Sequence, residues 1–133
     1  MVNIDKIYNM LSWDNDMSVQ LQGMQMAQQI KSLWVLILPI LPQNSKSIWE
    51  NCAKVLAAKS DCELFPYLTE LFKWFQDMNW PGASIIYDRL LEIDVKEISL
   101  PLSICLLTAQ NTNDKPWEAS LTAFKNHIIQ GDG

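Results

Sequence analysis

The sequence predicts one all-α domain, in which about three pairs of helices stack as a short right-handed α-α superhelix. Only Gly23 and Gly82 precede the C-terminal tail, whereas hairpin folds need turn glycines. Long stretches place apolar residues three and four positions apart, as one face of a helix does. A pattern centred on proline also recurs, as in helical repeat proteins. With 133 residues, 49% of them apolar, the chain is expected to form one domain over 1–133 with a frayed tail.

Five stretches carry the helical pattern, each with an apolar face that a neighbouring helix would cover. They are residues 18–33, 47–58, 64–75 and 81–93, and a last helix marked by Leu121, Phe124 and Ile128. Ser, Asn and Asp residues precede these stretches, and their side-chain oxygens accept the free amides of a first helical turn. We expect N-caps, in chain order, at Asp16 or Ser18, Asn44 or Ser45, Ser60 or Asp61, Asn79, and Asp114.

The repeat consists of a proline that directly follows an apolar residue within an apolar segment, at Pro39, Pro66 and Pro101. Proline in a helix interior removes a hydrogen bond, so each of the three is expected at a helix start. Each unit then contains a helix, a polar turn and a second helix entered through proline, and stacking covers the face that one unit leaves open. Prolines also start helices in non-repetitive proteins, but the matched flanks favour a repeat. The first unit is irregular because Pro42 follows Pro39 closely.

Residues 72–83 read FKWFQDMNWPGA. They resemble the W-L-Q-D-M-N-W-P-x-A signature of a small bacterial family of unknown function, whose members are similar to short HEAT-type helical repeats. Phe75 stands where the signature has leucine. The matching positions are Trp74, Gln76, Asp77, Met78, Asn79, Trp80, Pro81 and Ala83. The close similarity covers about residues 64–91, the region 13–30 is more loosely similar, and the C-terminal third does not match closely. The resemblance implies a HEAT-like fold and no catalytic residues.

The same motif predicts a corner between two helices. Trp74 is expected near the end of one helix, Asn79 caps the next, and Pro81 opens it. Trp80 would pack back onto the helix of Trp74 as a hydrophobic staple. The alternative is a binding surface built on Trp80 and Asp77.

Charge and hydropathy exclude several classes of partner. The formal net charge of −5 repels nucleic acid and permits a basic protein partner. The longest apolar run, residues 33–41, contains a proline and is too short to cross a bilayer. Asp5 and Lys6 interrupt the start, so no signal peptide is expected. We expect a cytoplasmic protein.

The residues for catalysis or metal binding are sparse, and we expect no enzyme and no cofactor. The chain has a single histidine, His127, so a cysteine nucleophile would have no other imidazole as its base. Residues 14–18 suggest the start of a calcium loop, but Val19 stands where the loop requires glycine and Gln25 where it requires glutamate. Arg89 is expected only in a surface pair with Glu92. Free buried thiols in a reducing cytosol are expected at Cys52, Cys62 and Cys105.

The aromatic content suggests a contact surface. The chain has six tryptophans, and we expect four to be buried and one or two to be partly exposed. The candidate partner-binding residues form two groups, Trp13 with Asp14 and Asp16, and Trp80 with Asp77 and Asn79. Both tryptophans could instead staple helix entries. The leading hypothesis is a non-enzymatic protein-interaction module, by analogy a bacterial immunity protein that neutralises a toxin. The alternative is a ligand-binding or enzymatic helical domain with an apolar pocket lined by Trp and Met.

Overall fold

The computed structural model describes residues 3–37 and 46–131. Every regular element in these ranges is helical, which confirms the predicted all-α class. The α-helices are α1 (Ile4–Leu11), α2 (Met17–Ala27), α3 (Trp49–Ala57), α4 (Asp61–Leu64), α5 (Leu68–Leu71), α6 (Ala83–Leu91), α7 (Val95–Asn111) and α8 (Lys115–Gly131). Short 3-10 helices between them are η1 (Leu33–Leu36), η2 (Lys46–Ile48), η3 (Phe65–Tyr67) and η4 (Phe72–Gln76).

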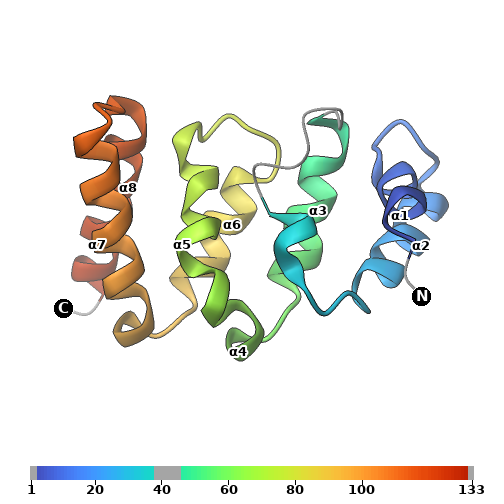
Figure 1. Ribbon diagram of the computed structural model, residues 1–133, viewed down its shortest axis with the longest axis horizontal. Coiled ribbons are helices and arrows are strands. Elements are labelled where there is room, and N and C mark those ends of the chain that lie inside the picture. Colours follow the sequence, from blue (N-terminus) through green and yellow to red (C-terminus); the bar gives the residue numbers. More distant parts are fainter. Residues whose placement is uncertain (1–2, 38–45, 132–133) are drawn as a thin grey trace.

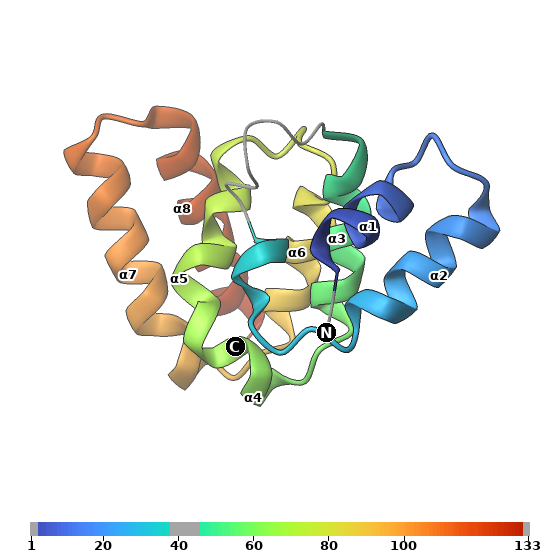
Figure 2. The same ribbon diagram turned by 45° about the vertical axis from the view of Figure 1, so that its right-hand side comes forward.

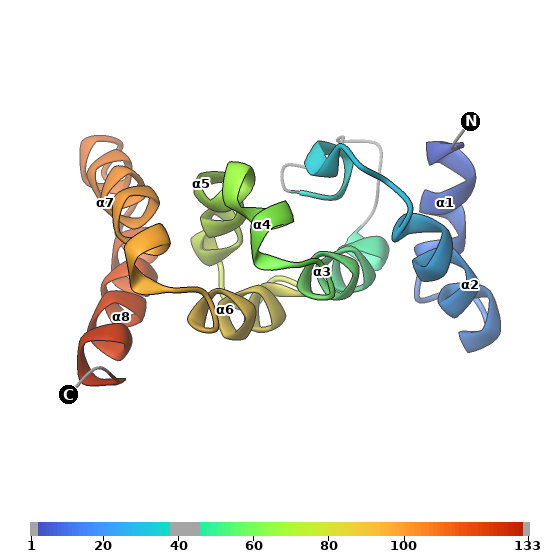
Figure 3. The same ribbon diagram turned by 90° about the horizontal axis from the view of Figure 1, so that it is seen from below.

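The helices stand side by side along one direction, with α1 and α2 at one end and α7 and α8 at the other (Figure 1). Seen from below, they form two rows (Figure 3). One row contains α1, η1, α4 with α5, and α7, and the other contains α2, α3, α6 and α8. Within this arrangement α1 packs on α2, α3 on α6, α5 on α7 and α7 on α8. The core therefore runs the length of the molecule between the rows.

The first helix was not among the predicted stretches. Asn3 caps α1 by accepting a hydrogen bond from the Lys6 amide at 3.0 Å. Ile7 and Leu11 are buried one turn apart, so this short helix contributes a full apolar face to the core. The Tyr8 hydroxyl donates to the Val35 carbonyl, which ties α1 to η1.

The predicted caps are partly confirmed. Ser60 caps α4 in a capping box with Glu63, and the Asp114 side chain accepts from the Trp117 amide at 3.1 Å at the start of α8. Asp16 occupies the N-cap position of α2, but its carbonyl accepts the amides while its side chain makes no cap bond. The alternatives Asn44 and Ser45 lie outside the described residues.

The prolines do not all start helices. Pro39 lies outside the described residues, and Pro66 lies in η3, where it separates α4 from α5. Pro101 lies inside α7, so its predicted place at a helix start is wrong. The helix starts earlier because the Asp94 side chain accepts the Lys96 amide at 2.9 Å. Pro101 has no amide hydrogen to donate to the carbonyl of Glu97, four residues earlier. Glu97 is exposed, so water can solvate this carbonyl instead.

Other predicted boundaries also shift. The helix expected over 18–33 ends at Ala27, and the stretch expected over 64–75 breaks into α4, η3, α5 and η4. Its apolar stripe is nevertheless buried as predicted, at Leu64, Leu68, Leu71, Phe72 and Phe75. Burial thus follows the apolar pattern even where Pro66 prevents one continuous helix.

An aromatic cluster closes the core between η4, α6 and α8. The Phe72 ring lies edge-on to that of Phe124 at 5.3 Å, and Phe75 stacks on Tyr87 at 5.1 Å. The buried Trp117 donates its indole N–H to the Phe72 carbonyl at 3.0 Å. Edge-to-face and stacked pairs add stability beyond the area they bury. The last helix pair is thereby fixed to the rest of the molecule.

Two long cationic side chains tie one helix pair to the preceding one. Lys59, only 6% exposed, donates from Nζ to the Gln28 carbonyl at 2.6 Å, just beyond the end of α2. Arg89 on α6 donates to the carbonyls of Ala57 at 3.0 Å and Lys59 at 2.8 Å, at the end of α3. These carbonyls have no partner inside their own helices. Arg89 does pair with Glu92 at 3.5 Å, but the expectation that this is its only role is wrong.

Candidate functional site

The predicted corner at residues 74–83 is a tight turn held by its own backbone. The Asp77 carboxylate accepts the Asn79 amide at 2.8 Å, and the Asp77 carbonyl accepts the Trp80 amide at 3.0 Å. The buried Trp74 ring donates from Nε1 to the Pro81 carbonyl at 3.2 Å. The Asp77 side chain is therefore engaged inside the turn.

The helix after this turn begins later than predicted. Its N-cap is Gly82, with φ of 90°, and neither Asn79 nor Pro81 belongs to α6. A Cβ at position 82 would lie 2.6 Å from the Ala53 Cβ and 3.0 Å from the Trp49 carbonyl oxygen. Only glycine combines this left-handed conformation with so close an approach to α3. The proximity of α3 thus decides where α6 starts.

Trp80 packs on α3, while its contact with the helix of Trp74 stays a prediction. Its ring lies edge-on to the half-buried Trp49 at 5.5 Å. The Lys46 ammonium on η2 lies 5.5 Å from the Trp49 ring centroid and 6.0 Å from that of Trp80, within cation–π range. Of the three predicted residues here, Asn79 is exposed, while Asp77 and Trp80 are half-buried.

The other predicted group lies in the turn between α1 and α2, which projects at one end of the molecule (Figure 2). Trp13 is 49% exposed, and Asp14 and Asp16 are exposed beside it in sequence. Met17 and Leu21 follow on α2, one turn apart, and both are exposed. We call these five residues the Trp13 surface.

A buried polar network holds this turn in place. Asn51 on α3 donates from Nδ2 to the Leu11 carbonyl at 2.7 Å and to Gln20 Oε1 at 3.0 Å. Gln20 in turn donates to the Asn15 carbonyl at 2.8 Å. Networks of this kind fix geometry because each buried polar group needs its partner. The Trp13 surface therefore sits on a rigid support.

The short helix η2 contacts both predicted groups. The Trp13 amide donates to the Ser47 carbonyl at 3.0 Å, and the Ser12 and Ser47 hydroxyls are 3.0 Å apart. The adjacent residue, Lys46, lies over the rings of Trp49 and Trp80. Among the described residues the rings of Trp13 and Trp80 do not form an aromatic pair. The two groups are thus neighbours across η2.

Part of this site was not predicted, and fewer tryptophans are buried than expected. The apolar residues of the stretch 18–33 were expected to face a neighbouring helix, but Leu21 in this stretch is exposed. Two of the six tryptophans, Trp74 and Trp117, are buried, so the expectation of four buried tryptophans is wrong. The others are half-buried Trp49 and Trp80 and exposed Trp13 and Trp34. The exposure of Met17 and Leu21 could have been suspected from their spacing to Trp13, since Met17 is four residues after Trp13 and Leu21 is four residues after Met17.

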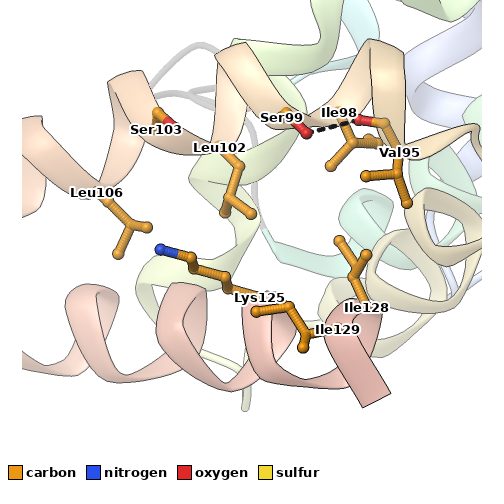
Figure 4. A pocket seen from close by; sticks show the side chains of 9 residues that line it. All are labelled: Val95, Ile98, Ser99, Leu102, Ser103, Leu106, Lys125, Ile128 and Ile129. Carbon is orange, nitrogen blue, oxygen red and sulfur yellow. Dashed lines mark hydrogen bonds between the residues drawn. The ribbon is translucent and has the colours of Figure 1, made fainter. Parts of the chain in front are cut away.

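A cavity of about 210 Å³ lies between α7 and α8. Figure 4 shows aliphatic side chains from both helices turned toward it, with Lys125 extending along its edge. The Ser99 hydroxyl at its rim donates to the Val95 carbonyl at 2.7 Å. None of its lining residues is Trp or Met, so it differs from the pocket that the alternative hypothesis expected.

The groups with catalytic potential are dispersed. Burial raises the pKa of Cys52 to about 12 and that of Cys105 to about 11, which keeps both thiols protonated. Cys62 is exposed, so its predicted burial is wrong, because it lies on the outer side of the short α4. His127 is exposed on α8, with its ring 6.2 Å from that of Tyr87. In residues 3–37 and 46–131, no group of three or more His, Cys, Asp or Glu side chains is placed to hold a metal ion.

The helices in the described part of the chain include none with the length and apolar character needed to cross a bilayer. No curated protein and no solved structure matches the chain. Residues 41–131 match DUF5071, a domain of unknown function. This match includes the Trp74 corner and extends through α8, so it also covers the C-terminal third, where the resemblance to the signature is not close. The chain therefore belongs to the DUF5071 family.

Proposed function

We propose that this chain is a non-enzymatic protein-interaction module that binds its partner through the Trp13 surface. The observation that carries the proposal is the exposure of Trp13, Met17 and Leu21 together at one end of the molecule. Large apolar side chains that gather in solvent are typical of binding surfaces, and Trp is enriched among the residues that dominate binding energy.

The support beneath this surface favours tight binding. Asn51 and Gln20 hold the α1–α2 turn through buried hydrogen bonds, so little conformational entropy is lost when a partner binds. Lys46 and Trp80 across η2 give a second contact region beside the first. A partner that reaches both would cover the two predicted groups at once.

The charge supports a basic partner. Asp14 and Asp16 flank the apolar side chains, and the chain carries a formal net charge of −5. Complementary charge speeds association and selects among partners. More specifically, we propose that the chain is a cytoplasmic bacterial immunity protein that binds and neutralises a basic toxin. Its small size and its acidic charge support this role.

We also propose that the helix pairs form a short HEAT-like right-handed superhelix. In support, α3 packs beside α6 and α5 beside α7, so that successive pairs make similar contacts. Ser60 and Asp94 cap the second segment of two successive pairs, and Pro66 and Pro101 follow at nearly the same distance. Stacked pairs offer an extended surface for a protein partner.

A second candidate function is the binding of a small apolar ligand between α7 and α8. It is favoured by the cavity of about 210 Å³ with its aliphatic lining and the Lys125 ammonium at its edge. A co-purified small molecule, displaced by substituting Leu102→Trp to fill the cavity, would favour this function over the first.

The test of the main proposal uses the full chain as bait in extracts of its native host. We expect one protein to be retained stoichiometrically, and to be lost when Trp13→Ala or the pair Asp14→Lys and Asp16→Lys is introduced. The matched control is Trp34→Ala, another exposed tryptophan at a different place, which should retain the protein. Equal retention by wild type and Trp13→Ala would exclude the Trp13 surface as the binding site. Binding of the purified pair, measured by calorimetry, gives the loss in affinity.

A further inference from the structure

The helix α7 carries an apolar stripe on the side that faces away from the core. Leu100 is 68% exposed, Ile104 45% and Leu107 58%. The buried side of the same helix is formed by Ile98, Leu102, Cys105 and Ala109. At 100° per residue the exposed stripe lies nearly opposite the buried one. This stripe is at the other end of the molecule from the Trp13 surface (Figure 1).

The stripe has the spacing of a coiled-coil seam. Within the exposed stripe, Ile104 lies four positions after Leu100, and Leu107 lies three positions after Ile104. In heptad terms the two leucines therefore occupy d positions and Ile104 occupies an a position. The neighbouring a positions are Glu97 and Asn111, both exposed. Leu at d with a β-branched residue at a favours a parallel two-stranded pairing, and a single Asn at a fixes register. A seam of this kind is complementary to an identical seam.

We propose that two copies of this chain associate through α7, with the two α7 helices parallel and related by a two-fold axis. In this arrangement Leu100, Ile104 and Leu107 of one copy pack against the same residues of the other. Two-fold dimers are the commonest closed assemblies, because one self-complementary surface suffices. The helix is already held by α5 and α8, so association requires no helix formation.

The charges beside the seam select the parallel arrangement. Lys96 and Glu97 are exposed and form no ion pair within the described part of the chain. In a parallel pair the two Glu97 residues occupy one a layer, so their carboxylates face each other. The residue before an a position lies beside the a position of the other helix, so Lys96 of each copy lies beside Glu97 of the other and offsets this repulsion. The two Asn111 amides also meet, where they can hydrogen-bond to each other.

An antiparallel pair would lose these contacts. There, a positions face d positions. One register sets Asn111 against Leu100 of the second copy, and the other sets Glu97 against Leu107. Each buries a polar group or a charge against leucine without a partner, which is unfavourable.

The first test is the mass of the full chain by sedimentation equilibrium between about 1 and 500 µM, a range that covers weak self-association. We expect a concentration-dependent twofold rise in mass. Ile104→Asp should abolish it, while Leu21→Asp, a matched exposed aliphatic residue on α2, should leave it unchanged. Circular dichroism establishes that both variants are folded. A chain that stays monomeric throughout, or a dimer that survives Ile104→Asp, overturns the proposal.

The second test determines the direction of the helices. Leu107→Cys in a Cys62→Ser background, which removes the native exposed thiol, should form a disulfide-linked dimer on mild oxidation. Only a parallel pair brings the two copies of position 107 together. The control Leu21→Cys in the same background should stay monomeric under oxidation. A dimer in solution that Leu107→Cys fails to cross-link overturns the parallel arrangement.

Discussion

Arg89 Nη2 lies 2.6 Å from Asp61 Oδ1 and donates to it, while the same guanidinium satisfies two carbonyls at the end of α3. The Arg89 side chain is only 10% exposed. One side chain thus joins α6 to the end of α3 and to the start of α4. Its planar fork is suited to several acceptors at once, which a lysine ammonium is not.

Arg89→Ala is expected to destabilise the fold by about 2–3 kcal/mol, because it leaves partly buried carbonyls without a donor. Arg89→Lys should restore only part of this loss. Urea denaturation monitored by circular dichroism measures both. Lys54→Ala is the control, since Lys54 pairs with Glu50 at 4.0 Å on the surface and should cost less than about 0.5 kcal/mol. Equal losses for the Arg89 and Lys54 variants would contradict the assigned role of Arg89.

Gly82→Ala is expected to destabilise by about 2–5 kcal/mol, combining left-handed strain with a clash against α3. The added Cβ would lie 2.6 Å from that of Ala53. Thermal and urea unfolding report the loss. Ser84→Ala, two residues further on an exposed position of α6, should change stability by less than about 0.5 kcal/mol. A Gly82→Ala protein as stable as wild type would show that α6 can start without this close approach.

The thiols are expected to react in two classes. Cys62 is exposed, whereas Cys52 and Cys105 are buried with raised pKa values, and thiolate is the reactive form. A thiol-reactive dye at neutral pH should label Cys62 quickly in the folded protein and the other two only after unfolding. Cys62→Ser should remove the fast phase. Rapid labelling that persists in Cys62→Ser would show that the core opens.

Stability should fall in acid through Glu63. Hydrogen bonds from the Ser60 amide and hydroxyl lower the pKa of the Glu63 carboxyl below its ordinary value of 4.5. A carboxyl whose pKa is lower when folded stabilises the protein above the unfolded pKa, and this contribution is lost as pH falls through the folded pKa. Carboxyl NMR titration should give a midpoint below 4.5 that Ser60→Ala raises. A midpoint insensitive to Ser60→Ala would contradict the capping box.

Local chemistry made part of the fold predictable. Ser60 and Asp114 cap helices as expected because a cap needs only the residues of one turn. The burial of Leu64 and Phe75 follows from apolar spacing, which holds although Pro66 interrupts the helix. In the candidate site, Trp13 was likewise named from the sequence as a candidate contact residue together with Asp14 and Asp16, and all three are exposed.

The remaining features depend on residues far apart in the chain. Gly82 starts α6 because α3 approaches it, and no local signal marks that approach. Trp80 packs on Trp49, and Arg89 reaches the end of α3, so their roles depend on how helices pair. The exposure of Leu21 likewise reflects which face of α2 its neighbours cover, which apolar spacing alone does not decide.

Lys59 and Arg89 both lie later in the chain than the helix ends that their side chains satisfy. Lys59 satisfies the end of α2, and Arg89 satisfies the end of α3 and the carbonyl of Lys59 itself. The helices α2 and α3 are therefore each completed by a donor from the next helix pair along the chain. During synthesis from the N-terminus, the early pairs emerge with open carbonyl ends and are closed only when the later side chains arrive. A shortened chain that stops before α6 should thus lose the last turn of α3 as well as the missing helices.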